Sequence, residues 1–299
     1  MKKNQLSGVI FVFLSAVIFG FTPVLAAISY QGGNNGINMA FLRAFLPIPV
    51  LLLLWFFTAR KSVPTRRQVG TGVILGGLLF GCTLLLYSSY AYISPGIATT
   101  LHFMYPLYVV LFNTVFRRQK PGLIRIVGML LGMIGAVMLV DLGGGSSDPV
   151  GLFLAFLSGI FYAAYILVLQ KESASPMPLY QLMTIVSISG AALCAVVGLS
   201  MGKLTLALTA PAWGYAVSVA MLTAIVGCVL FQAGVRRVGD ANAAIFSLLE
   251  PLTSIVFGVL LLHDLFSLQK GLGCGLILLG LLCTSCADLV KKKEAVKKA

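Results

Sequence analysis

Residues 98–135, ATTLHFMYPLYVVLFNTVFRRQKPGLIRIVGMLLGMIG, and residues 243–280, AAIFSLLEPLTSIVFGVLLLHDLFSLQKGLGCGLILLG, align without a gap at an offset of 145 positions. Each is an apolar run of helical length interrupted by a proline, followed by a polar turn and a glycine-spaced apolar run. The matched pairs are Ala98 with Ala243, Pro106 with Pro251, Phe112 with Phe257, Leu123 with Leu268, Gly128 with Gly273, and Gly135 with Gly280. Apolar matches arise easily by chance, whereas a register that aligns a proline and two glycines does not. The chain is therefore predicted to be duplicated, with repeats over 1–145 and 146–290 and a basic tail over 291–299.

The composition is typical of a membrane protein. Hydrophobic residues fill 59% of the 299 positions and charged residues only 10%, against roughly 25% charged in soluble domains. Backbone polar groups in hydrocarbon need partners within their own segment, so continuously apolar runs of about 20 residues predict membrane-spanning helices rather than barrel strands. We expect an all-α integral membrane protein whose ten transmembrane helices lie near residues 7–28, 37–58, 70–91, 95–116, 122–141, 149–169, 179–200, 211–233, 241–262 and 270–290.

The basic residues indicate how the chain is oriented. The net charge is +13, with 21 lysines and arginines against 8 acids, but these residues do not cluster on a soluble surface as nucleic-acid binding would require. With a cytoplasmic N-terminus, 18 of the 21 fall in cytoplasmic segments, whereas Lys203 and Lys270 fall outside and Arg43 lies within a span. This asymmetry predicts that both termini are cytoplasmic. We expect a multi-pass protein of the cell inner (plasma) membrane with no nucleic-acid partner.

The sequence offers no catalytic or metal site. All six cysteines lie in apolar runs, where a thiol packs as a small hydrophobe. Cys283 and Cys286 have the spacing of a redox or metal pair, but no second pair or nearby histidine completes a site. A Walker phosphate loop, a membrane zinc motif and an activated serine are also missing from the sequence. We therefore expect no enzymatic activity, no cofactor and no bound metal.

The number of spans per repeat determines how the two halves are related. Five is odd, so the second repeat must enter the membrane from the opposite side to the first. Inverted repeats are a recurrent plan of secondary transporters, whose substrate site lies between the halves near the midplane. The duplication therefore predicts transport by alternating access.

With these features, the chain resembles the ten-helix, EamA-type members of the drug/metabolite transporter superfamily. The resemblance covers essentially the whole chain and rests on the five-plus-five repeat, on SAVIFGFTPV at 15–24 and on SLLEPLTSIVFGVLLLHDLFSLQKGLGCGLILLG at 247–280. The family pattern of proline, acid and glycine-rich fifth span is matched in the second half by Glu250, Pro251, Asp264, Gly273 and Gly280. In the first half, Gln119 stands in place of the acid at Asp264. The resemblance implies an exporter or permease for small metabolites and leaves the substrate unspecified.

Two charged residues inside the spans are candidates for the transport site, because such groups usually face the bundle interior. Glu250 is expected close to the midplane, where a lone carboxyl should be protonated or paired. It could couple transport to H+ or bind a cationic substrate group, or it could lock helices through Arg43 or through backbone freed by Pro251. Arg43 could snorkel to the outer surface, pair with Glu250, or hold an anionic substrate group such as a carboxylate.

The paired prolines give the strongest pointer to the site. Pro106 and Pro251 should interrupt their helices and free the carbonyls of His102 and Ser247, and such breaks tend to line cavities. His102 could relay protons, or it could be a neutral ring bonded to a hydroxyl. The two halves differ beside the prolines. In the alignment of the repeats His102 corresponds to Ser247, and Tyr105 corresponds to Glu250. Further residues that could line the cavity are Phe19, Thr22, Tyr87, Tyr90, Tyr162, Tyr165 and Gln232, whereas Tyr30 is expected in the interfacial aromatic belt.

Glycines spaced by four residues predict close helix packing. They occur in the third, fifth and tenth spans, and they could pack helices within one chain or form a homodimer through the fifth and tenth helices. The function expected is export of a small metabolite such as an amino acid, with proton coupling left open. The alternatives are an exporter of drugs or lipid-linked substrates, a flippase component and a membrane scaffold that does not transport.

Overall fold

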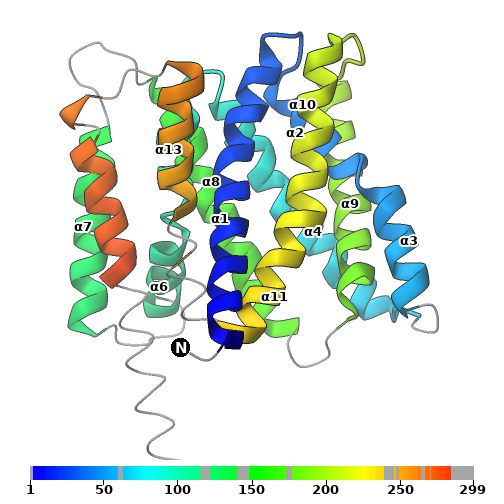
Figure 1. Cartoon of the computed structure of the whole chain (residues 1–299), viewed down its shortest axis with the longest axis horizontal. Helices are drawn as coiled ribbons and strands as arrows, with labels where there is room; N and C mark the ends of the chain where they lie inside the picture. Colours follow the sequence, from blue (N-terminus) through cyan, green and yellow to red (C-terminus); the bar gives the residue numbers. More distant parts are fainter. Residues whose placement is uncertain are drawn as a thin grey trace, which may run out of the picture.

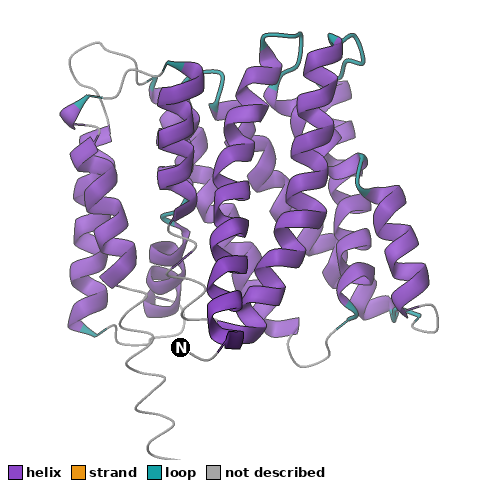
Figure 2. Cartoon of the chain, viewed as in Figure 1, coloured by secondary structure: helices purple, strands orange, loops and turns teal. Residues whose placement is uncertain are grey.

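The computed structural model describes residues 3–59, 63–115, 122–139, 148–172, 177–238, 246, 249–263, 267–269 and 271–283. Over these ranges the secondary structure is helical and contains no strand (Figure 2). The helices run side by side as a single bundle (Figure 1). The all-helical expectation therefore holds for the described part of the chain.

The first half of the chain forms the helices α1 Lys3–Tyr30, α2 Gly36–Phe45, α3 Ile48–Ala59, α4 Arg66–Ser89, α5 Pro95–His102, α6 Tyr105–Val115 and α7 Leu123–Leu139. The second half forms α8 Pro149–Glu172, α9 Leu179–Ser200, α10 Ala210–Met221, the π-helical segment η1 Leu222–Gly227, α11 Cys228–Val238 and α13 Leu249–Leu262. A further apolar helix, Gly271–Cys283, follows α13 and is called the last helix below.

Seven helical stretches of the described chain are long and apolar enough to cross a membrane. They are Leu6–Tyr30, Gly36–Thr58, Arg66–Ser89, Pro95–Val115, Pro149–Leu169, Leu179–Ser200 and Ala210–Gly234. Three shorter apolar helices, Ile126–Gly135, Leu249–Leu262 and Gly271–Cys283, lie where the fifth, ninth and tenth spans are expected. The protein is thus a multi-pass membrane protein.

The second span differs from the expectation of one continuous helix over 37–58. A turn at Leu46 and Pro47 separates α2 from α3. Proline has no backbone N–H, so Pro47 cannot bond to the carbonyl of Arg43 four residues earlier, and its ring disfavours helix in the preceding residue. This break puts Arg43 in the last turn of α2.

Most of the helix packing joins the first half of the chain to the second. Helix α1 packs against α10, α11 and α13, while α4 packs against α8 and α9. Helices α2 and α3 both contact α9, and α5 lies between α8 and α13. Residues near the middle of the bundle are therefore contributed by both halves.

Helix α7 and the last helix lie side by side at one edge of the bundle (Figure 1) and pack through glycines. A Cβ on Gly135 would stand 2.5 Å from the Gly273 carbonyl oxygen, and a Cβ on Gly280 would press on the Gly128 carbonyl. Gly280 is the repeat equivalent of Gly135, 145 positions later in the chain. Gly128 is the repeat equivalent of Gly273, 145 positions earlier, so the second pair is the first with its two halves exchanged. These glycines thus pack the two helices within the chain, whereas nothing lies within 4 Å of a Cβ on Gly275, one of the four-residue-spaced glycines of the tenth span.

The end of the bundle opposite the N-terminus is tied by polar contacts between two loops (Figure 1). Asn35 Nδ2 donates to the Lys203 carbonyl at 2.8 Å, and Thr209 N donates to the Gly32 carbonyl at 3.0 Å. These bonds join the α1–α2 loop to the α9–α10 loop. Near this end the Tyr30 hydroxyl donates to the Tyr87 carbonyl at 2.7 Å, so Tyr30 links α1 to α4.

Candidate functional site

Arg43 points into the bundle. Its Nε donates to Thr223 Oγ1 at 3.3 Å, and its Nη1 donates to Thr83 Oγ1 at 3.2 Å. The guanidinium carbon lies 5.5 Å from the centre of the Tyr87 ring, within the range of a cation–π contact. Its location in the last turn of α2 also places the cation at the partially negative end of a helix. The snorkelling expected as one alternative for Arg43 is wrong, because its partners come from α4 and η1.

The two threonines that bind Arg43 are oriented by their own helices. Thr83 Oγ1 donates to the Leu79 carbonyl at 2.9 Å, and Thr223 Oγ1 donates to the Val219 carbonyl at 2.7 Å. Each hydroxyl hydrogen is thereby used, and the oxygen lone pairs are left to accept from the guanidinium. Both acceptors are neutral, so neither balances the charge of Arg43.

Pairing of Arg43 with Glu250 was another alternative, and the described contacts do not include it. Arg43 bonds to Thr83 and Thr223, and no ion pair is recorded between described residues of the chain. Arg43 and Glu250 therefore stand in the bundle without neutralising each other.

Thr223 belongs to the π-helical segment η1 in the eighth span. Such segments are rare and occur frequently at functional sites. Ser15 of α1 donates its buried hydroxyl to the Gly227 carbonyl at the end of this segment, at 3.0 Å. The Phe19 ring lies against Gly227, where a Cβ would come within 2.9 Å of it. Side chains of α1 and α2 thus contact the π-helical segment at both ends.

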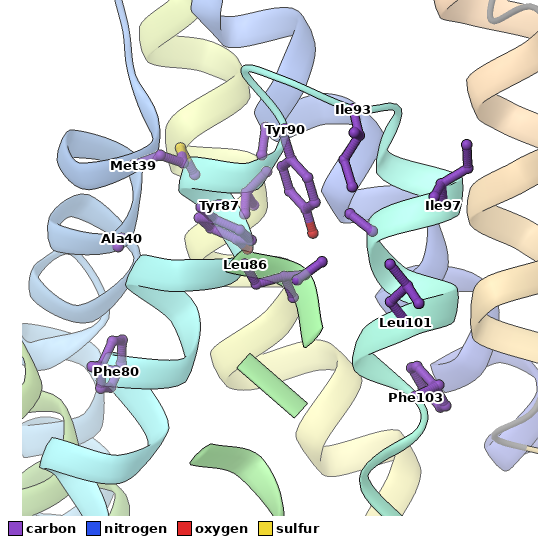
Figure 3. Packing of buried hydrophobic residues seen from close by; sticks show 14 of the residues in the cluster. Met39, Ala40, Phe80, Leu86, Tyr87, Tyr90, Ile93, Ile97, Leu101 and Phe103 are labelled. Atoms are coloured by element: carbon purple, nitrogen blue, oxygen red, sulfur yellow. The ribbon is translucent and has the colours of Figure 1, made fainter. Parts of the chain in front are cut away.

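Tyr87, which lies beside Arg43, packs against Tyr90 at the end of α4. Their ring centres are 5.4 Å apart, and both side chains are buried. The Tyr90 hydroxyl is fully enclosed and has no hydrogen-bond partner within the described chain. Figure 3 shows it directed toward Leu86 and the bundle interior between α4 and α5. Buried hydroxyls usually have partners, so the unpartnered Tyr90 hydroxyl, one ring away from Arg43, is an exception.

His102 is the last residue of α5, directly before the break in the fourth span. Its Nδ1 lies 3.1 Å from Ser158 Oγ of α8 and 3.9 Å from Cys82 Sγ of α4. Ser158 donates its own hydrogen to the Ala155 carbonyl at 2.6 Å, so its oxygen accepts from His102. Nδ1 therefore carries a hydrogen, as it does in one of the two neutral tautomers of histidine. The hydroxyl contact expected for a neutral His102 is therefore present.

The break itself lies at Phe103 and Met104, on the N-terminal side of Pro106. Proline fits the first turn of a helix because its missing N–H is not needed there, and Pro106 is the second residue of α6. On α8, Gly159 allows close approach to the freed backbone, since a Cβ there would lie 2.9 Å from the His102 carbonyl oxygen. The expected interruption of the fourth span is thus present.

Aromatic side chains surround His102. Its ring centre is 5.1 Å from that of Tyr162 and 6.1 Å from that of Tyr105. Tyr105 and Tyr162 meet edge to face at 4.6 Å, and Tyr162 stacks on Tyr165 at 5.5 Å. Glu250 lies close enough to interact electrostatically with Tyr105 and Tyr162. The structure thereby brings together five predicted site residues from α5, α6, α8 and α13.

Glu250 lies in the first turn of the described helix α13, one residue before Pro251. The N-terminal end of a helix is partially positive and favours an acidic side chain. On α1, Gly20 packs directly against the carbonyl of Glu250, so that α1 and α13 approach closely at this point. Residues 247–248 lie outside the described part, so the backbone before Pro251 and the predicted contribution of Ser247 cannot be placed.

The other predicted site residues lie apart from these contacts or outside the described chain. Thr22 is buried and donates to the Phe19 carbonyl of its own helix at 3.2 Å. Gln232 is half-buried in α11, and no contact with the residues above is recorded for it among the described side chains. Gln119 and Asp264, the two loop positions compared between the halves, fall outside the described residues.

Four site residues were not predicted: Thr83, Thr223, Ser158 and Cys82. Each is a small polar or sulfur-bearing residue within a long apolar run, and all but Cys82 hydrogen-bond to their own helix backbone as well. That local bond is the usual behaviour of such residues in membrane helices. Polarity within an apolar run was the available signal, but it does not distinguish these residues from other buried hydroxyls of the bundle.

Comparison with known proteins finds relatives among membrane transporters. The model of the EamA-like transporter family matches residues 6–141 and, separately, residues 149–286. The uncharacterized transporter YcbK of Bacillus subtilis (strain 168) is 25% identical over 293 residues, which cover 91% of each protein. The aromatic amino acid exporter YddG of Escherichia coli (strain K12) is 28% identical over 138 residues, which cover 40% of this chain and 45% of that protein. A solved crystal structure shares the fold, with a TM-score of 0.64 at 18% identity over 94% of this chain and 98% of the other.

Proposed function

Because this chain belongs to the EamA-like transporter family, we propose that it exports a small metabolite, such as an amino acid, across the inner (plasma) membrane by alternating access. The observation that carries the proposal is the set of ionisable side chains inside the bundle at helix ends. Arg43 lies in the last turn of α2, His102 ends α5, and Glu250 lies in the first turn of the described α13. Ionisable groups at such depth are expensive and usually serve transport.

Alternating access would rest on two inverted five-helix repeats, residues 1–145 and 146–290, in a bundle of ten spans with cytoplasmic termini. The packing supports this arrangement, since α1 meets α11 and α13 while α8 meets α4 and α5. These are the contacts expected if exchange of the two halves leaves the structure similar. The exchanged glycine pairs of α7 and the last helix support it in the same way. Two similar, oppositely oriented units would give inward-open and outward-open states of similar energy.

Amino acids are the first substrates to test. A relative named as an aromatic amino acid exporter matches part of this chain. The ring contacts among Tyr105, Tyr162 and Tyr165 would offer an aromatic side chain favourable packing. Glu250, beside these rings, would bind the substrate amine or carry the coupling proton.

The test is transport by purified protein in liposomes, measured with labelled aromatic and aliphatic amino acids and with cationic drugs. Saturable uptake or counterflow of an amino acid is the expected result, and no saturable flux of any compound would argue for a scaffold. Flux of drugs alone would instead favour a drug exporter. Homodimerisation through α7 and the last helix remains a prediction, which the mass of the reconstituted protein would test.

Proton coupling is tested separately with Glu250→Gln, which keeps the size of the side chain and removes its charge. Flux is compared with and without a pH gradient in wild type and variant. The variant should lose the gradient dependence while retaining exchange of substrate. Asp148→Asn is the matched control, because Asp148 precedes α8 and accepts from the Val150 amide at 2.7 Å, away from the bundle interior. Unchanged gradient dependence in Glu250→Gln would remove Glu250 from the coupling step.

A further inference from the structure

Arg43 carries a positive charge into the bundle without a counter-ion among the described residues. An ion taken out of water loses several kcal/mol of solvation, which hydrogen bonds donated to neutral hydroxyls restore only in part. The bonds to Thr223 and Thr83, together with the side-chain hydrogen bond to Tyr87, use three of its five N–H groups. The guanidinium thus retains both net charge and hydrogen-bonding capacity.

The contacts of Arg43 also show how much of the guanidinium remains available. Thr223 holds Nε, Thr83 holds Nη1, and the Tyr87 ring lies beside the group with its centre 5.5 Å from Cζ. The Tyr87 side chain also shares a hydrogen bond with the guanidinium. A planar guanidinium held by three side chains still has two of its five N–H donors available, the number that a carboxylate can accept.

Tyr90 supplies a second, independent observation. Its side chain is 7% exposed, and its enclosed hydroxyl has no partner in the described chain. Its ring centre lies 5.4 Å from that of Tyr87, with the two rings tilted by 39°, and Tyr87 is the side chain that lies beside Arg43. An unused phenolic donor one ring away from an unneutralised cation is complementary to an anionic group with two or more oxygen acceptors.

We propose that Arg43 and the Tyr90 hydroxyl form the subsite for a carboxylate group on the transported molecule. The proposal rests on the transport function above and specifies its substrate class. A single-charged carboxylate fits better than a phosphate dianion, since no second lysine or arginine is recorded in contact with Arg43, Tyr87 or Tyr90 in the described chain. The nearby His102 uses its Nδ1 hydrogen on Ser158 and, unlike a lysine or arginine, need not carry a charge.

Matched probes separate the carboxylate from the rest of the molecule. One set is L-phenylalanine, 3-phenylpropanoate and phenethylamine, and a second is L-leucine, 4-methylpentanoate and isoamylamine. Binding to purified protein is measured by the rise in apparent melting temperature with probe concentration, since a ligand stabilises the state it binds. At least one carboxylate of a set should stabilise the wild type, and the amine lacking the carboxylate should not.

The variants assign the effect to the two residues. Arg43→Met should abolish stabilisation by the carboxylate, and Arg43→Lys should retain weaker binding. Tyr90→Phe should raise the Kd roughly tenfold to a hundredfold, the usual effect of a hydrogen bond to a charged group. Tyr108→Phe is the matched control, because it also removes an enclosed hydroxyl without a recorded partner but lies on α6 against Phe156. It should leave the Kd unchanged.

Several results would overturn the subsite. They are equal stabilisation by amines and carboxylates, no stabilisation by any carboxylate, and equal Kd values for Tyr90→Phe and wild type. Should Arg43→Met fail to fold, Arg43→Lys and the Tyr90→Phe and Tyr108→Phe pair still decide the matter. Saturable liposome flux of amines alone would reject the subsite while keeping the transporter. Binding of carboxylates that depends on Arg43, with no flux of any compound, would keep the subsite and reject transport.

Discussion

The exchanged glycine contacts between α7 and the last helix predict two substitutions with similar effects. A Cβ at Gly135 would stand 2.5 Å from the Gly273 carbonyl oxygen and 2.9 Å from the Ile277 amide nitrogen. A Cβ at Gly280 would press on the Gly128 carbonyl in the same way. These are backbone atoms, which cannot turn aside as a flexible side chain can, so either alanine must push the two helices apart. Overpacking of this kind typically costs about 1–3 kcal/mol.

The double variant tests whether one movement relieves both clashes. Gly135→Ala and Gly280→Ala should each lower the free energy of unfolding, and together they should cost less than the sum, because a single separation of the helices admits both methyl groups. Unfolding in detergent can be followed by the fluorescence of Trp55 and Trp213, where 1 kcal/mol corresponds to about 2–4 °C in chains of 150–250 residues. Gly275→Ala is the control, since nothing lies within 4 Å of its added methyl group. Additive losses, or losses that differ by more than about 1 kcal/mol, would refute the reciprocal packing.

Three further substitutions test the residues that hold the site in place. Gly159→Ala should displace α8 from the break in the fourth span, because its Cβ would lie 2.9 Å from the His102 carbonyl oxygen, and liposome flux should fall; undiminished flux would show that this approach is not required. Ser158→Ala removes the acceptor of His102 Nδ1 and should cost about 1–3 kcal/mol of unfolding free energy, while an unaltered melting temperature would contradict the hydrogen bond. Tyr30→Phe removes the donor to the Tyr87 carbonyl and should destabilise the protein by a similar amount in the same melting assay, so a neutral result would mean that this bond adds nothing.

The local chemistry of proline explains both a success and a failure of the sequence analysis. Pro106 was recognised through its match with Pro251, and the fourth span is divided just before it. Pro47 acts by the same physics and divides the second span, but it has no partner at the offset of 145 and lies within the apolar run 45–54. The run was therefore taken as one helix. Hydrophobicity locates a span, but Pro23 lies inside the continuous helix α1, so a proline by itself does not show where a helix is divided.

The site could be predicted less completely than the fold because its contacts join distant parts of the chain. Arg43 was singled out as a charge in an apolar run, but its partners Thr83 and Thr223 lie 40 and 180 positions away. Tyr30 was expected in the interfacial belt, and it bonds to a carbonyl 57 positions away. Residue type alone shows that a buried arginine is costly and needs hydrogen-bond partners. Which residues supply those partners depends on how α2 packs against α4 and near η1.

Three ionisable side chains of the described interior, Arg43, His102 and Glu250, all lie at helix ends, and the small stabilisation that a helix end gives to a charge bears on function. Arg43 and His102 lie in last turns of helices, and Glu250 lies in the first turn of the described α13. Each sits where the partial charge of a helix end suits the charge that the group can carry, and such an end contributes typically 0.3–1 kcal/mol, or up to about 2 kcal/mol when partly buried. Removing an ion from water costs several kcal/mol, so helix ends alone cannot compensate for a permanent charge. His102 and Glu250 can avoid the cost by being neutral, but Arg43 cannot, because a guanidinium stays protonated in proteins. An anion that enters with the substrate would complete the compensation at Arg43, and its departure would restore the cost, which is the energetic difference that a carrier needs between its loaded and empty states.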